Sequence, residues 1–361
     1  SRAKKELPAT KSFKRKKQGL HWLKNPASRT LSIHDVFKMG EDGCREFFLR
    51  ARWPDGNPTC PDCGSQRIYN IKSQKRYKCA NPECHKFFSI TSGTMFAHKR
   101  ITYLELMFIV RAMAVHAKGA ASIWLSHDYD HDYKTVWVLT DKLREVMFLD
   151  QEDVHLVGEV EIDGAYFGGY LKQANKKDER IDRRRIPVNG RKRQCVVLLR
   201  ERGGQGRLLT RTFKSERQAV SWITESVDRS ATILADEGSG WEPLYASHSL
   251  QRVNHKKEFC TDEGFHTNGA ESAFSRMRRA EIGVHHHIAG DYLDFYAADG
   301  AWREENRRLD DRSKVQKLIR AAMGLPPSRT FAGYWQASGP RRENDRNHDV
   351  LRALGINDND D

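Results

Sequence analysis

Three acidic residues have a local sequence suited to holding divalent metal ions. Asp163 ends an apolar-alternating run that begins at Val157, and Asp236 ends a second run that begins at Ala231. Such alternation predicts strands, so both aspartates are predicted at strand ends. Glu271 lies in the first turns of a predicted helix. Two strand-borne aspartates and a helical acid can hold two Mg²⁺ or Mn²⁺ ions for phosphoryl transfer, the chemistry that cuts or joins nucleic acid.

The third acidic position has an alternative interpretation. Asn268 stands three residues before Glu271, a spacing that is typical of a helix capping box and would make the glutamate structural. A carboxylate binds Mg²⁺ more tightly than a neutral amide, which favours Glu271 as the ligand. Asn268 would then orient water or phosphate. Glu161 shares a strand face with Asp163 by period two and is a further candidate ligand.

The surrounding pattern predicts an α/β domain with a mixed sheet. Strands are predicted at 157–163, 194–199, 207–213 and 231–236, with a helix at 215–225 that Ser215 caps. Three meandering strands, a helix and a parallel strand are the ribonuclease-H-like order, which places the two aspartates on adjacent strands. A basic insertion at 172–193 carries ten Lys or Arg residues. This insertion either contacts a polyanion or keeps the loop soluble.

Ahead of this domain stands a strong metal-binding pattern, C-x2-C-x15-C-x4-C, formed by Cys60, Cys63, Cys79 and Cys84. Each close pair can present two thiolates from a tight knuckle, and four thiolates complete a tetrahedral Zn²⁺ site. The segments 67–71, 75–78 and 86–90 are the predicted strands of a zinc ribbon. Structural Zn²⁺ would supply the folding free energy of so small a unit. A disulfide framework is the competing interpretation.

Three helices are predicted between the ribbon and the sheet, at 103–115, 120–125 and 133–144. The arrangement suggests a helix-turn-helix, in which Tyr133, Lys134 and Thr135 begin the recognition helix at the DNA major groove. A plain packing bundle fits as well, because the apolar residues of these helices also have core spacing. A short lead-in helix is predicted from about Leu31 to Phe48, with Ser32 as its N-cap.

Composition favours a nucleic-acid partner. The chain of 361 residues has a formal net charge of +14, which attracts a polyanion in a salt-dependent manner. Basic proteins also bind anionic membranes, but no apolar run of membrane-spanning length and no signal peptide is present, so a cytoplasmic protein is expected. The first 17 residues carry eight Lys or Arg, so residues 1–30 are expected to form a flexible arm that orders on DNA or remains a solvated tail.

Four motifs together resemble a known family. In order along the chain they are DGAYFGG at 163–169, ADEGSGW at 235–241, TNGAESAF at 267–274 and GVHHH at 283–287. They resemble the catalytic core of bacterial insertion-sequence transposases of the DDE type, in the branch with a zinc ribbon ahead of a ribonuclease-H-like domain. The resemblance covers roughly residues 60–308. Together with the composition of the two ends, it predicts five regions: the arm (1–30), a lead-in helix and ribbon (31–98), a helical DNA-binding region (99–150), the catalytic domain (154–325) and a polar tail (326–361).

The resemblance also implies an activity. Such an enzyme binds the terminal inverted repeats of a mobile element, frees a 3′ hydroxyl and transfers that end to target DNA in the bacterial nucleoid. A homodimer on double-stranded DNA would hold two element ends together. Two alternatives remain: a domesticated transposase that regulates through DNA binding, and a ribonuclease-H-like nuclease that cleaves without joining.

Further site residues follow from the same resemblance. Arg278 stands where these transposases carry a basic residue that contacts the phosphate next to the scissile bond, and Arg276 and Arg279 widen that basic face. His286 and His287 match paired histidines that donate to phosphate. In this branch Asn can fill the third catalytic position, which leaves Glu271 and Asn268 as alternatives.

Overall fold

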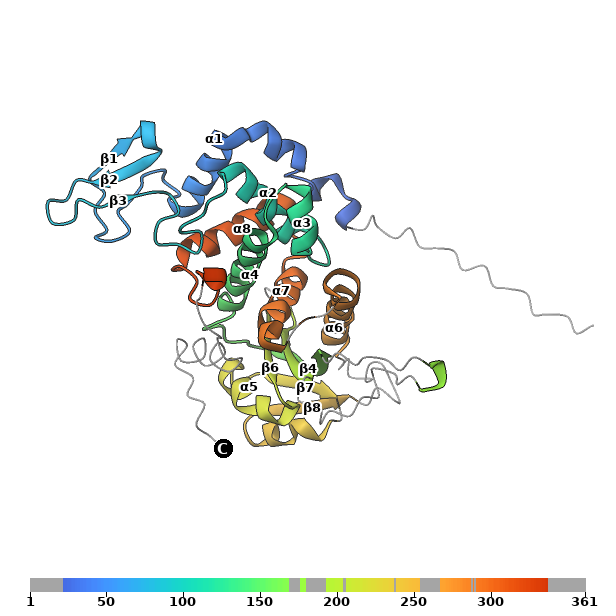
Figure 1. Cartoon of the computed structure of the whole chain (residues 1–361). Helices are drawn as coiled ribbons and strands as arrows, with labels where there is room; N and C mark the ends of the chain where they lie inside the picture. The colour runs from blue at the N-terminus through green and yellow to red at the C-terminus, as the bar shows by residue number, and fades with distance from the viewer. Residues whose placement is uncertain are drawn as a thin grey trace, which may run out of the picture.

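The computed structural model describes residues 22–168, 176–179, 193–203, 206–236, 238–253, 267–286, 288 and 290–336 (Figure 1). A small three-stranded ribbon lies at one end of the molecule and a five-stranded sheet at the other, with helices between them. The basic arm up to residue 21, most of the 172–193 insertion and the tail beyond 336 lie outside the described residues. No helix in the described ranges is long and apolar enough to span a bilayer.

The N-terminal half begins with the predicted lead-in helix. Ser32 accepts from the backbone N–H of Asp35, and Asp35 accepts in return from the backbone of Ser32, so the predicted cap is confirmed as a full capping box. A kink at Gly40, where φ is 60°, divides the helix. The helices and strands of this half are α1 (Ile33–Arg52), β1 (Ile68–Ile71), β2 (Arg76–Cys79), β3 (Phe87–Phe88), α2 (Tyr103–Val115), α3 (Ser122–Asp128) and α4 (Tyr133–Leu149).

One large hydrophobic core joins the ribbon to the helices. Cys60, Tyr77 and Phe88 of the ribbon are buried in the same cluster as residues of α1, α2 and α4. Helix α8 (Asp311–Gly324) also packs on these three helices, although the sequence pattern groups 154–325 with the sheet. Phe331 follows α8, is fully buried and contacts Trp137 of α4 edge to face, so this aromatic side chain anchors the start of the predicted tail.

A buried ion cluster fastens this helical core to the second half of the chain. Arg144 of α4 is fully buried and contacts Asp141 at 3.0 Å and Asp299 at 3.4 Å. Its guanidinium also lies 4.1 Å from the ring centroid of Tyr296. Asp299 and Tyr296 belong to α7 (Leu293–Glu305), so the cluster fixes α4 against the helix that covers the sheet. Removing one member of such a cluster leaves an uncompensated buried charge.

The second half is a mixed α/β unit, as predicted. Its sheet has the strand order β6-β5-β4-β7-β8, in which β4, β5 and β6 are antiparallel and β7 is parallel to β4 and β8. The pattern missed β8. The elements are β4 (Glu159–Gly168), β5 (Arg193–Glu201), β6 (Leu208–Phe213), α5 (Val220–Ser226), β7 (Thr232–Asp236), β8 (Ser249–Val253), α6 (Asn268–Ala280) and α7.

Two local predictions are wrong. Asp163 is not at a strand end, because β4 continues to Gly168 through its antiparallel pairing with β5. Ser215 makes no side-chain cap, since a 3₁₀ turn at Glu216–Ala219 precedes α5. Asp236, in contrast, is the last residue of β7, as predicted.

The two faces of the sheet are covered by different helices. Alternate residues of β4 such as Val160 and Ile162 share a core with α5, whereas Ala165 and Phe167 share a core with α6 and α7. By the two-residue period of a strand, Asp163 lies on the α6 face. Asp236 also lies on the α6 face, because the preceding residue of β7, Ala235, belongs to the core on the α5 face.

Candidate functional site

Asp163 and Asp236 lie level with each other on neighbouring strands. Parallel pairing of β4 with β7 places Glu161 opposite Leu234. Two residues further along, on the same face of the sheet, these strands carry Asp163 and Asp236. Neighbouring strands are about 4.8 Å apart. Asp236 is oriented by its Oδ1 atom, which accepts from the backbone N–H of Gly238 at 3.1 Å and from the indole of Trp241 at 3.0 Å. Within the described chain its Oδ2 atom accepts no hydrogen bond.

Helix α6 is anchored over this edge by Glu161. One carboxylate oxygen of Glu161 accepts from the backbone N–H of Ala270 at 2.9 Å, and the other pairs with Arg202 at 2.8 Å. A β-carbon on Gly269 would lie 2.6 Å from the first of these oxygens, so the close approach requires glycine. Both carboxylate oxygens of Glu161 are thus engaged within the protein, and its role is to position α6 and not to bind metal.

The capping-box interpretation of Asn268 and Glu271 is wrong. Asn268 is the first residue of α6, and the N-cap position belongs to Thr267, which makes no side-chain cap. Both Asn268 and Glu271 are exposed. They are three residues apart in the helix and so share a face.

The electrostatics of Asp163 indicate that the acids are clustered. Burial, together with the negative charges of Asp236, Glu271 and Glu216, raises the pKa of Asp163 to about 7. Of the described residues, only the four ribbon cysteines form a group of three or more ligating side chains with all ligand atoms within 4.8 Å of one another. The carboxylates of Asp163, Asp236 and Glu271 are therefore farther apart than the ligand atoms of the cysteine site.

The pKa of Asp163 predicts how metal binding depends on pH. Below about pH 7 a cation must displace a proton from this carboxyl group, so affinity should weaken about tenfold per pH unit. We expect calorimetric titration with Mg²⁺ to give rising affinity from pH 6 to pH 8, with proton release at pH 6. Because the pKa is raised on folding, the free energy of unfolding without added divalent metal should fall as the pH rises through 7. Metal affinity that is constant between pH 6 and pH 8 would contradict this expectation.

Glu216 is an acid that sequence reasoning missed. It begins the 3₁₀ turn after β6, where a first-turn glutamate is ordinary, so nothing local marks it. The structure places it near both aspartates: burial and then the charge of Asp236 raise the pKa of Glu216. Its neighbours Gly164 and Gly240 are far away in the sequence, which is why only the fold reveals the contact.

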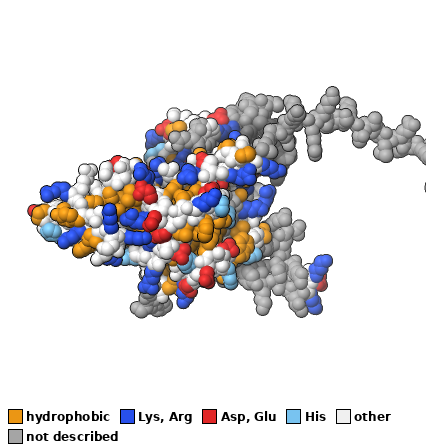
Figure 2. Space-filling view, turned by 90° about the horizontal axis from the view of Figure 1, so that it is seen from above, with side chains coloured by type: hydrophobic (Ala, Val, Ile, Leu, Met, Phe, Trp, Pro, Cys, Tyr) orange, Lys and Arg blue, Asp and Glu red, His pale blue; other side chains and the backbone are white. Residues whose placement is uncertain are grey.

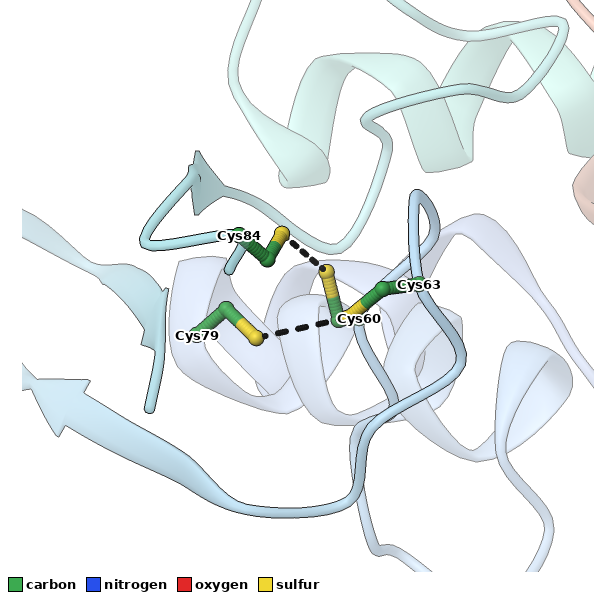
Figure 3. Close-up of side chains that lie close together, drawn as sticks. All are labelled: Cys60, Cys63, Cys79 and Cys84. Atoms are coloured by element: carbon green, nitrogen blue, oxygen red, sulfur yellow. Dashed lines mark hydrogen bonds between the residues drawn. The ribbon is translucent and has the colours of Figure 1, made fainter. Parts of the chain in front are cut away.

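The four ribbon cysteines converge as predicted (Figure 3). The Sγ atoms of Cys60 and Cys84 are 3.7 Å apart, and those of Cys63 and Cys79 are 3.5 Å apart. Thiolates around one tetrahedral Zn²⁺ at the usual bond length are about 3.8 Å apart. A disulfide would require about 2.05 Å, so the disulfide alternative is wrong. The tetrad is a metal site, and its donor set of four thiolates suits structural zinc.

The basic residues of α6 point in different directions. Arg278 is exposed, and its guanidinium lies 6.0 Å from the ring centroid of Phe167 on β4. Arg279 is exposed and donates to Ser275. Arg276 pairs with Glu304 at 2.5 Å and is therefore directed toward α7.

Arg276 lines a groove between α6, α7 and the turn after α2. We call it the basic groove; its volume is about 750 Å³, and its Lys and Arg residues are Lys118, Arg276, Arg303, Arg307, Arg308 and Lys314. Only Asp299 and Glu304 oppose them among the lining residues. The face drawn in Figure 2 is mixed, with Lys and Arg side chains scattered among acidic and apolar ones. The groove is therefore a local concentration of positive charge beside α6.

The histidines after α6 differ from one another. His285 packs edge-on against Tyr296 with ring centroids 4.8 Å apart, and burial together with the charge of Arg144 lowers its pKa to about 4. It is therefore neutral near pH 7. His286 is exposed, with φ at 59°, and His287 lies outside the described residues.

The first turn of α4 is exposed and the rest of the helix is core. Tyr133, Lys134 and Thr135 are exposed, while Val136 and Leu143 are fully buried. Lys134 lies over the ring of Trp335 at 5.3 Å. The geometry therefore combines both sequence interpretations: α4 packs in a helical bundle and still presents its first turn to solvent.

Comparison with protein-family models gives two matches. Residues 39–87 match the transposase zinc-ribbon domain, and residues 155–305 match the ISXO2-like transposase domain, a DDE-type transposase domain. The first segment contains the cysteine tetrad, and the second contains the three acids on β4, β7 and α6. No curated protein matches the chain.

Proposed function

Because this chain belongs to the DDE-type transposases that join a zinc ribbon to an ISXO2-like transposase domain, we propose that it moves an insertion sequence by cleaving and rejoining DNA. The ribbon and the first turn of α4 would bind the terminal inverted repeats of the element. The end would then be cleaved to expose a 3′ hydroxyl, and the same site would join that hydroxyl to target DNA. One active site would serve both steps, with no covalent protein intermediate.

One observation carries the proposal: Asp163 and Asp236 are level on neighbouring strands, and the charge of Glu271 acts on Asp163 from the helix above. Clustered carboxylates repel one another unless a cation neutralises them, and hard oxygen donors are what Mg²⁺ and Mn²⁺ prefer. The donor set therefore fits a pair of divalent cations. Asp163, Asp236 and Glu271 would be the residues that hold them.

When bound, these cations would activate the attacking oxygen and stabilise the leaving oxygen of an in-line displacement. The protein supplies the positioning. Glu161 holds the start of α6 against β4, and Trp241 fixes the carboxylate of Asp236. Arg278 lies two helical turns beyond Glu271 and would contact the phosphate beside the scissile bond.

The basic groove supports a path for the DNA backbone along α6. The groove is lined by six basic side chains and only two acidic ones, and the electrostatic field of such a patch attracts phosphates. Arg276 would contribute through the groove, whereas Arg279 and His286 would act from the exposed side of α6. His287 and the basic insertion, which lie largely outside the described residues, would be further DNA contacts. Two ends must be held together for transfer, so we expect a homodimer on double-stranded DNA.

Product analysis tests the proposed reaction. The protein is incubated with Mg²⁺, a labelled element end and a supercoiled plasmid, and the plasmid is then examined for covalently attached label. Joined products are expected. Nicks without joining would instead indicate a ribonuclease-H-like nuclease, and tight binding of the end with no cleavage would indicate a DNA-binding regulator.

The identity of the third catalytic residue is tested by two matched substitutions. We expect Glu271→Gln to slow cleavage about 100-fold or more, because an amide replaces a metal-binding carboxylate. Asn268→Ala should slow it less, because only the orientation of water or phosphate is lost. The cleavage rates of the two variants are compared at saturating Mg²⁺. The reverse order of severity would assign the third position to Asn268.

A further inference from the structure

Three glycines make room for one additional carboxylate, that of Glu216, beside the aspartate pair. Glu216 approaches Gly164, a β4 residue on the α5 face of the sheet, opposite the face that carries Asp163 and Glu271. A β-carbon on Gly164 would lie 2.7 Å from Cγ and from Oε1 of Glu216. A β-carbon on Gly240 would lie 2.9 Å from Cβ of Glu216 and 3.1 Å from its Oε2 atom. Any side chain at either glycine would displace the glutamate.

Glu216 and Asp236 converge on one place. The position of a β-carbon on Gly238 would be 2.9 Å from Oδ1 of Asp236 and 3.6 Å from Oε2 of Glu216, so both oxygens lie within 4 Å of a single point. Three glycines thus clear the space in which these two carboxylates approach each other at the end of β7.

A purely structural glutamate in this position would be expected to pair with a donor. Within the described chain, however, the Glu216 carboxylate accepts no hydrogen bond and joins no ion pair. Two carboxylates that approach one point repel each other when both are ionised, and a bound cation relieves that repulsion. A divalent cation is the ligand whose charge and oxygen preference match the arrangement.

We propose that Glu216 is a fourth carboxylate ligand of the catalytic metal site, reaching the cation held by Asp236 from the α5 side of the sheet. This inference rests on the proposed function. Asp163, Asp236 and Glu271 would hold metal from the α6 face, whereas Glu216 would reach it from the α5 face at the end of β7. A carboxylate on each face of the sheet would hold the cations in place during the in-line displacement.

Binding of Mn²⁺ to the full-length protein without DNA tests this assignment, by calorimetry and by electron paramagnetic resonance. We expect Glu216→Gln to weaken Mn²⁺ binding about 10–100-fold or to remove one bound ion. Its melting temperature without divalent metal should stay the same or rise, because a repulsive charge is gone, and the stabilisation by Mn²⁺ should shrink. Glu225→Gln, at an exposed position of α5, is the matched control and should behave like the wild type.

A second variant leaves every carboxylate in place. Gly164→Ala inserts a methyl group where Glu216 lies and should reproduce the weakened Mn²⁺ binding. Gly324→Ala, where a β-carbon meets no atom within 4 Å, should not. Wild-type Mn²⁺ affinity and ion count in both Glu216→Gln and Gly164→Ala would overturn the inference alone. Failure of the wild-type protein itself to bind Mn²⁺ or to cleave DNA would instead overturn the proposed function.

Discussion

Replacing Asp163 by asparagine is expected to slow Mg²⁺-dependent cleavage of an element end at least about 1,000-fold. A catalytic metal contributes several kcal/mol to the transition state, and each 1.36 kcal/mol is a factor of ten in rate. Asp163 would hold the cations together with Asp236 and Glu271, so an asparagine amide in place of its carboxylate should weaken cation binding. Asp236→Asn should have a comparable effect. Gel analysis of single-turnover cleavage at saturating Mg²⁺ measures the loss.

The fold and the binding of DNA should survive these substitutions. Asp163 lies among like charges that raise its pKa, so a neutral side chain relieves repulsion and should not lower the melting temperature. Glu159→Gln is a suitable control, because Glu159 is on the same strand but pairs with Arg202 at the surface. Cleavage at the wild-type rate by Asp163→Asn or Asp236→Asn would be incompatible with the proposed site.

The second large effect is expected in the ribbon. Replacing the buried Cys79 by serine should abolish zinc binding, since structural Zn²⁺ contributes about 10–16 kcal/mol of apparent binding free energy in comparable small units. The ribbon shares its core with α1, so its loss should also expose Tyr77 and Phe88 and lower the melting temperature. Native mass spectrometry and hydrogen exchange over residues 57–90 report both changes. Affinity for the element end should fall.

Cys44 provides the matched control for this substitution. It is another fully buried cysteine of the same core, but it lies in α1 and outside the tetrad. Cys44→Ala should retain one zinc ion per chain and lose only the stability of a small packing defect. If Cys79→Ser retained its zinc ion, the four-thiolate site would be wrong.

Local patterns were sufficient where the interactions are local. The spacing of the four cysteines predicts the metal site because each close pair forms its own knuckle; in the first, Gly64 donates to the carbonyl of Cys60. The capping box of α1 is equally local. Asp236 is correctly placed at the end of β7, because the apolar run stops at a turn that contains Gly238 and Gly240.

Prediction failed where residues distant in sequence decide the structure. Pairing of Gly164 with Val197 on β5 extends β4 past Asp163, and no alternation in the sequence reveals that extension. The start of α6 is held by Glu161 from β4 instead of by the neighbouring Asn268. Glu216 joins the acidic cluster only because the fold brings Gly164 and Gly240 to it, so its contribution could not be inferred from its position in the chain.

A structure of the protein with a bound DNA end, grown with Mn²⁺ and measured for anomalous scattering, tests the central claim most directly. The account predicts anomalous peaks within about 2.2 Å of carboxylate oxygens of both Asp163 and Asp236, next to the phosphate that is cleaved. Peaks at neither aspartate, or a scissile phosphate bound away from the end of β7, would contradict it.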